Sequence, residues 1–65
     1  MVKINGEMQQ AAGKTVAAYL EEAGYDSRAV AVEHNEVILP KERYASTRLA
    51  DGDTVEIVCF MGGGC

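Results

Sequence analysis

The final four residues are the part of this sequence whose types and spacing best suit chemistry. Residues 62–65 read Gly-Gly-Gly-Cys, and a glycine segment without Cβ atoms can thread a narrow channel and carry a carboxyl group into an active site. Fully extended, the segment spans about 13 Å at roughly 3.3 Å per residue, enough to cross the wall of another protein's pocket. A frayed end or an expression scar is the alternative. No packing side chain precedes Cys65 there, so we expect residues 62–65 to form a flexible tail.

The remaining candidates for chemistry are isolated side chains. His34 is the sole histidine and has no Ser, Cys or metal-ligand partner at a recognisable spacing, which favours a solvated turn residue. Cys59 is typical of a small core hydrophobe. Cys65 has no base or helix N-terminus placed to lower the pKa of its thiol, and a reducing cytosol disfavours a Cys59–Cys65 disulfide. We therefore predict no catalytic residue and no metal site in the chain itself.

Size and charge exclude several classes of function. Sixty-five residues make one small domain, close to the lower limit for a self-supporting core and too small to enclose an active-site cleft easily. This favours a carrier or adaptor over an independent enzyme. A formal net charge of −4 would be repelled by a phosphate backbone, so a nucleic-acid partner is not expected. An acidic surface instead suits a partner whose docking site is positive.

The sequence has no long apolar run of the kind that spans a membrane, and no signal-peptide pattern. Its two cysteines do not form the framework of a disulfide-rich secreted domain. We therefore expect a cytoplasmic protein without a membrane partner.

Two local signals define the first half of the fold. Asn5-Gly6 between alternating segments predicts a β-hairpin, because a type I′ turn needs positive φ at both central positions. The returning strand, residues 7–10, is polar and suits a sheet edge. Thr15 is a plausible N-cap and Gly24 a plausible C-terminal stop for one amphipathic helix. Its expected buried positions are Val16, Ala17, Tyr19, Leu20 and Ala23.

The second half of the sequence predicts strands separated by turns. Residues 29–33 form a predicted strand, His34-Asn35 a turn, and residues 36–38 a short strand. Pro40 ends that strand and can begin a short helical turn over residues 41–44. Leu49 is the expected core anchor of the segment that leads to the last strand, residues 54–60.

Alternation along the last strand assigns its two faces. Val55, Ile57 and Cys59 share one face, and Glu56, Val58 and Phe60 share the other. If the first set packs under the helix, two large apolar side chains remain on the open face of the sheet. We interpret Val58, Phe60 and Met61 as a partner-docking patch beside the tail, which Met8 could join. Scattered surface apolar residues are the alternative.

The end of the chain resembles a known family. The turn at residues 51–53, the strand to Val58 and the glycines at 62–64 are similar to the end of the ThiS/MoaD group of ubiquitin-like sulfur carriers, whose ThiS branch serves thiamine biosynthesis. The resemblance extends to the length, the single helix and the early turn at residues 4–7. It implies an α+β, β-grasp domain over residues 1–61, with first and last strands parallel at the centre of a mixed sheet, the helix packed on one face, and a tail over residues 62–65.

The resemblance also implies a function in which the chain is a co-substrate. A partner would adenylate the carboxyl of Gly64 after Gly62, Gly63 and Gly64 thread its active site, and sulfur would then convert it to a thiocarboxylate for thiazole formation. The implied partners are an E1-like, ThiF-type adenylyltransferase, a ThiG-type thiazole synthase, and a cysteine desulfurase or other sulfur donor. ATP and Mg²⁺ would be used by the adenylating partner, with no cofactor bound stably by the chain.

Cys65 departs from the family pattern, which ends in glycine. It can be a cap that is removed to expose Gly64, or an engineered handle. Other functions stay open at this point: a molybdopterin-synthase type of sulfur carrier, a ubiquitin-like protein modifier, and a non-catalytic β-grasp interaction domain.

Overall fold

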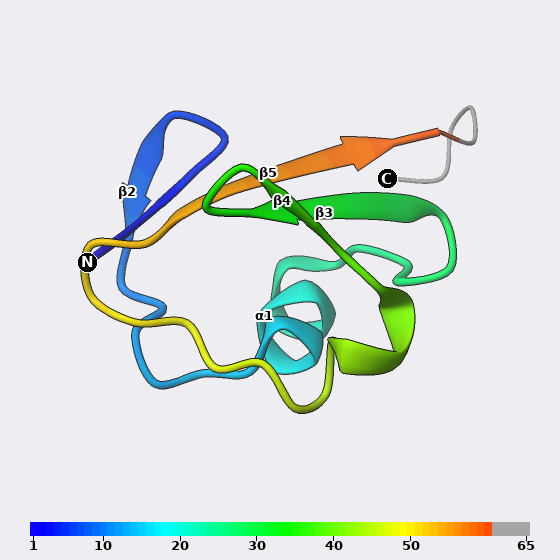
Figure 1. The fold of residues 1–65 in the computed structure, drawn as a ribbon, viewed down its shortest axis with the longest axis horizontal. Coiled ribbons are helices and arrows are strands. Elements are labelled where there is room, and N and C mark those ends of the chain that lie inside the picture. Colours follow the sequence, from blue (N-terminus) through cyan, green and yellow to red (C-terminus); the bar gives the residue numbers. More distant parts are fainter. Residues whose placement is uncertain (61–65) are drawn as a thin grey trace.

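The computed structural model describes residues 1–60, which form a mixed five-stranded sheet with one α-helix against it (Figure 1). The strand order is β2-β1-β5-β3-β4, with β1 and β5 parallel and the other neighbours antiparallel. This arrangement confirms the expected β-grasp, including the central parallel pair. The elements are β1 (Val2–Ile4), β2 (Glu7–Gln9), α1 (Val16–Ala23), β3 (Val30–His34), β4 (Val37–Leu39), the 3₁₀ helix η1 (Lys41–Arg43) and β5 (Thr54–Cys59).

The first hairpin forms as the Asn-Gly signal predicts. Asn5 and Gly6 have φ values of 52° and 85°, the positive pair that a type I′ turn requires. The turn returns the chain as β2 at one edge of the sheet. The Asn5 side chain also accepts a hydrogen bond from the backbone N–H of Ile57 at 2.7 Å, so the turn helps to fix β1 beside β5.

The helix begins and ends at the predicted capping residues. The Thr15 hydroxyl accepts a hydrogen bond from the N–H of Ala18 at 3.1 Å, and Gly24 closes the helix at φ 86°. Val16 and Leu20 are buried as predicted, but Ala23 is exposed. Ala23 is the last residue of α1, one turn beyond the buried Leu20, and lies past the part of the helix that packs on the core. Within residues 1–60 no helix is long and apolar enough to cross a lipid bilayer.

The second hairpin turns one residue later than expected. Asn35 and Glu36, not His34, have positive φ values, of 51° and 68°. His34 instead ends β3 and pairs with both Val37 and Val55. The backbone of Asn35 donates to Thr54 O at 2.8 Å, and this bond to the start of β5 shifts the turn along the chain.

The core lies between α1 and the covered face of the sheet. Leu49 contributes as expected, and Tyr44, predicted only as part of a helical turn, is 4% exposed and belongs to the core. The short helical turn after Pro40 forms as η1. The buried cluster consists of Val2, Ile4, Ala11, Val16, Leu20, Val30, Val32, Tyr44, Leu49, Val55 and Ile57.

Candidate functional site

The two faces of β5 differ as the alternation predicts. Val55 and Ile57 are 2% and 7% exposed and lie in the core, whereas Val58 and Phe60 are each 58% exposed. Cys59 is half-buried and packs against the core. Within residues 1–60, α1 covers one side of the sheet, so Val58 and Phe60 project from the uncovered side, which we call the open face.

Strand pairing sets the neighbours on the open face. Val58 lies opposite Ala31 on β3, and Glu56 lies opposite Glu33. Glu33 in turn pairs with the exposed Ile38 on β4. The open face therefore has an apolar end near Phe60, followed by a row with two adjacent carboxylates. Neither carboxylate forms an ion pair within the described part of the chain.

Met8 does not join the apolar end of the open face. Met8 pairs with Lys3, and Lys3 pairs with Thr54 at the beginning of β5. Val58 lies four residues further along that strand, a distance of about 13 Å at roughly 3.3 Å per residue. Met8 is exposed, but it stands at the other end of the sheet. Among the described residues, the predicted docking patch therefore comprises Val58 and Phe60.

Phe60 is held by groups from two other segments. Its N–H donates to the carbonyl of Ala29 at 3.1 Å, and the ammonium of Lys41 lies 5.1 Å from the centre of its ring. The Lys41 Nζ also donates to the carbonyl of Arg28 at 2.8 Å. Residues 61–65 follow Phe60 directly in the sequence. The sequence alone does not predict this contact, because no local signal indicates that Lys41 and Phe60 are neighbours.

A second polar cluster lies at the beginning of β5. His34 Nε2 donates to Asp53 Oδ2 at 2.7 Å, and the same carboxylate accepts from Ala50 N at 2.9 Å and Asn35 Nδ2 at 3.2 Å. The His34 bond, followed by the Ala50 bond, holds the pKa of Asp53 below its usual value. His34 is only 23% exposed, so the expectation of a solvated turn residue is wrong. The cluster joins the β3–β4 hairpin to β5 and lies at the opposite end of β5 from Phe60.

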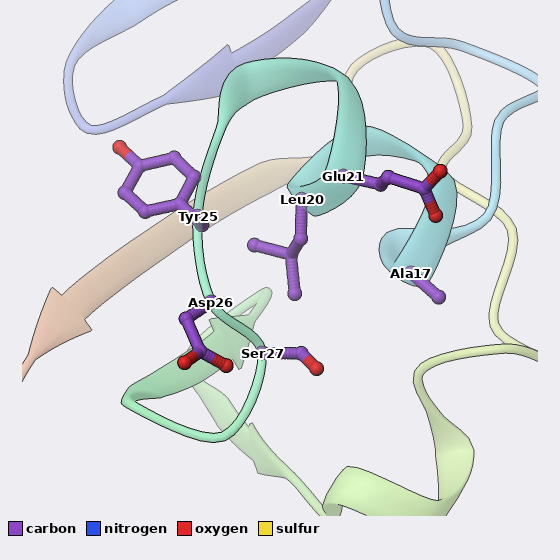
Figure 2. A pocket seen from close by; sticks show the side chains of 6 residues that line it. All are labelled: Ala17, Leu20, Glu21, Tyr25, Asp26 and Ser27. Atoms are coloured by element: carbon purple, nitrogen blue, oxygen red, sulfur yellow. The ribbon is translucent and has the colours of Figure 1, made fainter. Parts of the chain in front are cut away.

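A shallow pocket of about 270 Å³ opens beside the end of α1 (Figure 2). Leu20 lies between Glu21 on the helix and the loop that carries Asp26 and Ser27. The Asp26 carboxylate already accepts from the backbone N–H of Arg28 at 2.9 Å and from its side chain. The backbone bond is the main reason that the pKa of Asp26 lies below its usual value. The pocket lining is completed by Ala17 and Tyr25.

Several predicted site residues fall outside the described part. The threading segment at Gly62, Gly63 and Gly64, the docking residue Met61 and the possible cap Cys65 are all beyond residue 60. Cys59 is not a free thiol. The prediction that Cys59 forms no disulfide with Cys65 falls on a residue outside the described range. Within residues 1–60 no group of three or more His, Cys, Asp or Glu side chains is placed to hold a metal ion.

Comparisons with known proteins agree on one family. The ThiS family model matches residues 2–64. A thiazole synthase from Paramagnetospirillum magneticum is 55% identical over 62 residues, which cover 94% of this chain but 19% of that protein. The sulfur carrier protein ThiS of Thermus thermophilus is 42% identical over 64 residues, 98% of this chain and all of that protein. The crystal structure of the thiamine biosynthesis protein (ThiS) from Geobacter metallireducens matches with a TM-score of 0.77 and 33% identity, covering 97% of both chains.

Proposed function

Because this chain belongs to the ThiS family, we propose that it is a sulfur carrier protein of thiamine biosynthesis and that Gly64 provides the reacting carboxyl group. The observation that carries this proposal is the family match itself, which runs from residue 2 to residue 64 and so ends at Gly64. We expect the enzyme that acts on that carboxyl group to dock at the apolar end of the open face, where the chain leaves β5.

The chemistry follows from the poor reactivity of a carboxylate. A free carboxylate is a weak electrophile, because its leaving group would be oxide. Attack of the Gly64 carboxylate on the α-phosphorus of ATP releases pyrophosphate and gives an acyl-adenylate, whose leaving group is AMP. A sulfur nucleophile at the oxidation level of hydrosulfide then attacks the acyl carbon, AMP departs, and a thiocarboxylate remains. The adenylating partner would use Mg²⁺ to neutralise charge on the phosphates.

Catalytic side chains then belong to the partners, and the chain acts as a co-substrate rather than as an enzyme. A ThiF-type adenylyltransferase would activate Gly64, with Gly62 and Gly63 threading its channel. A cysteine desulfurase or another donor would supply the sulfur, and a thiol reductant would provide the two electrons that convert a persulfide donor's sulfur to the hydrosulfide level. A thiazole synthase contains a segment similar to this chain, which supports a ThiG-type thiazole synthase as the acceptor of the sulfur.

Docking would use the open face. Val58 and Phe60 are the large apolar side chains exposed at its apolar end, and Met61 follows directly in the sequence. Exposed aromatic side chains near the centre of an interface commonly carry much of the binding energy. A pocket on the adenylating enzyme that accepts Phe60 would place the following residues at its active site.

Cys65 allows a sharp test of the proposal. With Cys65 attached, the carbonyl of Gly64 belongs to an amide, and adenylation has no carboxylate to use there. We expect a chain that ends at Gly64 to support ATP–pyrophosphate exchange with the host's ThiF-type enzyme and the full chain to be inert. A matched control ending at Gly63 preserves the domain and shortens the tail by one residue. Exchange with the full chain but not with the Gly64 form would contradict Gly64 as the reacting residue.

A further inference from the structure

Phe60 is exposed to solvent, and a cation lies over its ring. The ring belongs to a side chain that is 58% exposed, and the ammonium of Lys41 lies 5.1 Å from its centre. The same nitrogen donates to the Arg28 carbonyl at 2.8 Å. The carbonyl gives the ammonium a second partner beside the ring, which favours the position over the ring among those that its four-carbon stem allows.

The backbone that carries Lys41 is anchored to the core. Lys41 begins η1, and its carbonyl accepts a hydrogen bond from the N–H of Tyr44 at 3.1 Å. Tyr44 is 4% exposed and is part of the core, and its own carbonyl accepts from Ala17 N of α1 at 2.9 Å. Lys41 is thus held in position by the helix and by the core.

The backbone of Phe60 is fixed as well. Its N–H bond to the buried Ala29 continues the β3–β5 pairing by one residue beyond the strand end. With both backbones hydrogen-bonded, the attraction between the Lys41 ammonium and the ring favours the Phe60 rotamer that keeps them in contact. An exposed phenylalanine without such a contact would exchange among its staggered rotamers.

We infer that Lys41 is a positioning residue that preorganises the Phe60 ring for docking on the adenylating partner. This inference rests on the proposed function, because it deepens the role of the same docking surface. Binding an exposed aromatic side chain requires it to be immobilised, and a ring that is already ordered loses less entropy on docking. Lys41 itself touches neither ATP nor the reacting carboxyl group in this account.

The test compares Lys41→Met with Lys41→Arg in the adenylation assay, on chains that end at Gly64. Methionine keeps an unbranched stem but removes the charge and the donor, whereas arginine can still stack on the ring and donate. We expect Lys41→Met to raise the KM for the chain about two- to fivefold, the range that an exposed cation–ring contact supports. The kcat should not change, because docking energy is lost equally from the ground and transition states. Lys41→Arg should restore the wild-type KM.

A charge control and a double-mutant cycle separate positioning from general electrostatic attraction. Lys14→Met removes the same charge from a lysine that pairs with Glu22 on the helix side, and it should leave the KM unchanged. In a Phe60→Leu background, Lys41→Met should have no further effect on the KM, since no ring remains to be positioned. An unchanged KM for Lys41→Met alone, or an equal increase in the Phe60→Leu background, would overturn the inference.

A measurement on the free domain keeps this inference distinct from the proposed function. Three-bond scalar couplings report the χ1 populations of Phe60, which should be narrow in the wild type and averaged in Lys41→Met. Identical populations in the two proteins would overturn the positioning role whatever the enzyme assay gives. If the wild-type chain ending at Gly64 is not adenylated at all, the proposed function fails, and the couplings still decide whether Lys41 orders the ring.

Discussion

The two faces of β5 differ in burial, and this difference separates their expected roles in folding and in docking. The covered face carries Val55 and Ile57 into the core, whereas the open face exposes Val58 and Phe60. Successive residues therefore have different tasks, because side chains alternate across a strand. In a chain of 65 residues this division matters, because within residues 1–60 the helix covers one side of the sheet (Figure 1). Changes of the buried side chains on the covered face should mainly affect stability, and changes of Phe60 on the open face should mainly affect binding.

The strongest test of this difference is a pair of neighbouring substitutions. Ile57→Ala should lower the free energy of unfolding by about 2–4 kcal/mol, because it removes buried methyl groups and leaves a cavity. Val58→Ala should lower it by no more than about 1 kcal/mol, the scale of β-propensity effects at an exposed strand position. Denaturant unfolding of both variants measures the difference. Equal losses would mean that the two faces do not divide these tasks.

The next largest effect is expected on binding. Phe60→Asp should weaken the affinity for the adenylating partner by about thirtyfold, the effect of losing an aromatic hot spot of ~2 kcal/mol. The fold should persist, because the side chain already lies in solvent. Titration calorimetry with the partner measures affinity, and circular dichroism checks the fold. A folded Phe60→Asp variant with wild-type affinity would remove Phe60 from the docking surface.

The cluster at the other end of β5 should influence stability alone. Hydrogen bonds, above all that from His34, lower the pKa of Asp53 in the folded state, so the ionised carboxylate stabilises the fold at neutral pH. This contribution should fade as the pH falls below about 4 and through the lowered pKa. We expect Asp53→Asn to cost about 1–2 kcal/mol near neutral pH and progressively less in acid.

The control for the Asp53 prediction is partner affinity. Asp53 lies at the opposite end of β5 from Phe60. Asp53→Asn should therefore leave the affinity for the adenylating enzyme unchanged. Unfolding curves of wild type and variant between pH 2 and pH 7 give the dependence. A stability difference that grows in acid would reverse the sign that we assign to Asp53.

The smallest effect concerns the paired carboxylates of the open face. Glu33 and Glu56 lie directly opposite each other on adjacent strands, and like charges in such a pair are destabilising. Glu56→Gln should therefore raise the free energy of unfolding by about 0.2–1 kcal/mol. Glu21→Gln on the helix makes the same change in charge and serves as the control. A loss of stability in Glu56→Gln would show that Glu56 has a favourable interaction.

Much of the fold could be predicted from local signals. Asn5-Gly6, Thr15 and Gly24 act through their own backbone geometry, so the hairpin turn and both helix ends were correct without tertiary information. The faces of β5 followed from alternation alone. The prediction that Ala23 is buried was wrong, because periodicity gives the direction of a side chain but not the extent of the surface that covers it.

The contacts that were missed join segments distant in sequence. The Asn35 turn shifts because its backbone bonds to Thr54, and Lys41 meets Phe60 only when η1 and β5 are packed. His34 likewise finds Asp53 through the pairing of β3 with β5. Neither the composition nor the residue spacing predicts contacts between residues so far apart in the sequence. The exposure of Val58 and Phe60 was predictable from the strand pattern, but the contact between Lys41 and the Phe60 ring was not.

Intact-mass spectrometry can test whether this chain carries sulfur at its terminal carboxyl group. A chain ending at Gly64 is incubated with the ThiF-type enzyme, ATP and a sulfur donor, beside the full chain and a reaction without ATP. We predict a gain of about 16 Da in the Gly64 form alone, as sulfur replaces one carboxyl oxygen after adenylation. The absence of that gain under conditions where the enzyme adenylates the chain, with a covalent ladder on lysines of other proteins instead, would contradict the account and indicate a protein modifier.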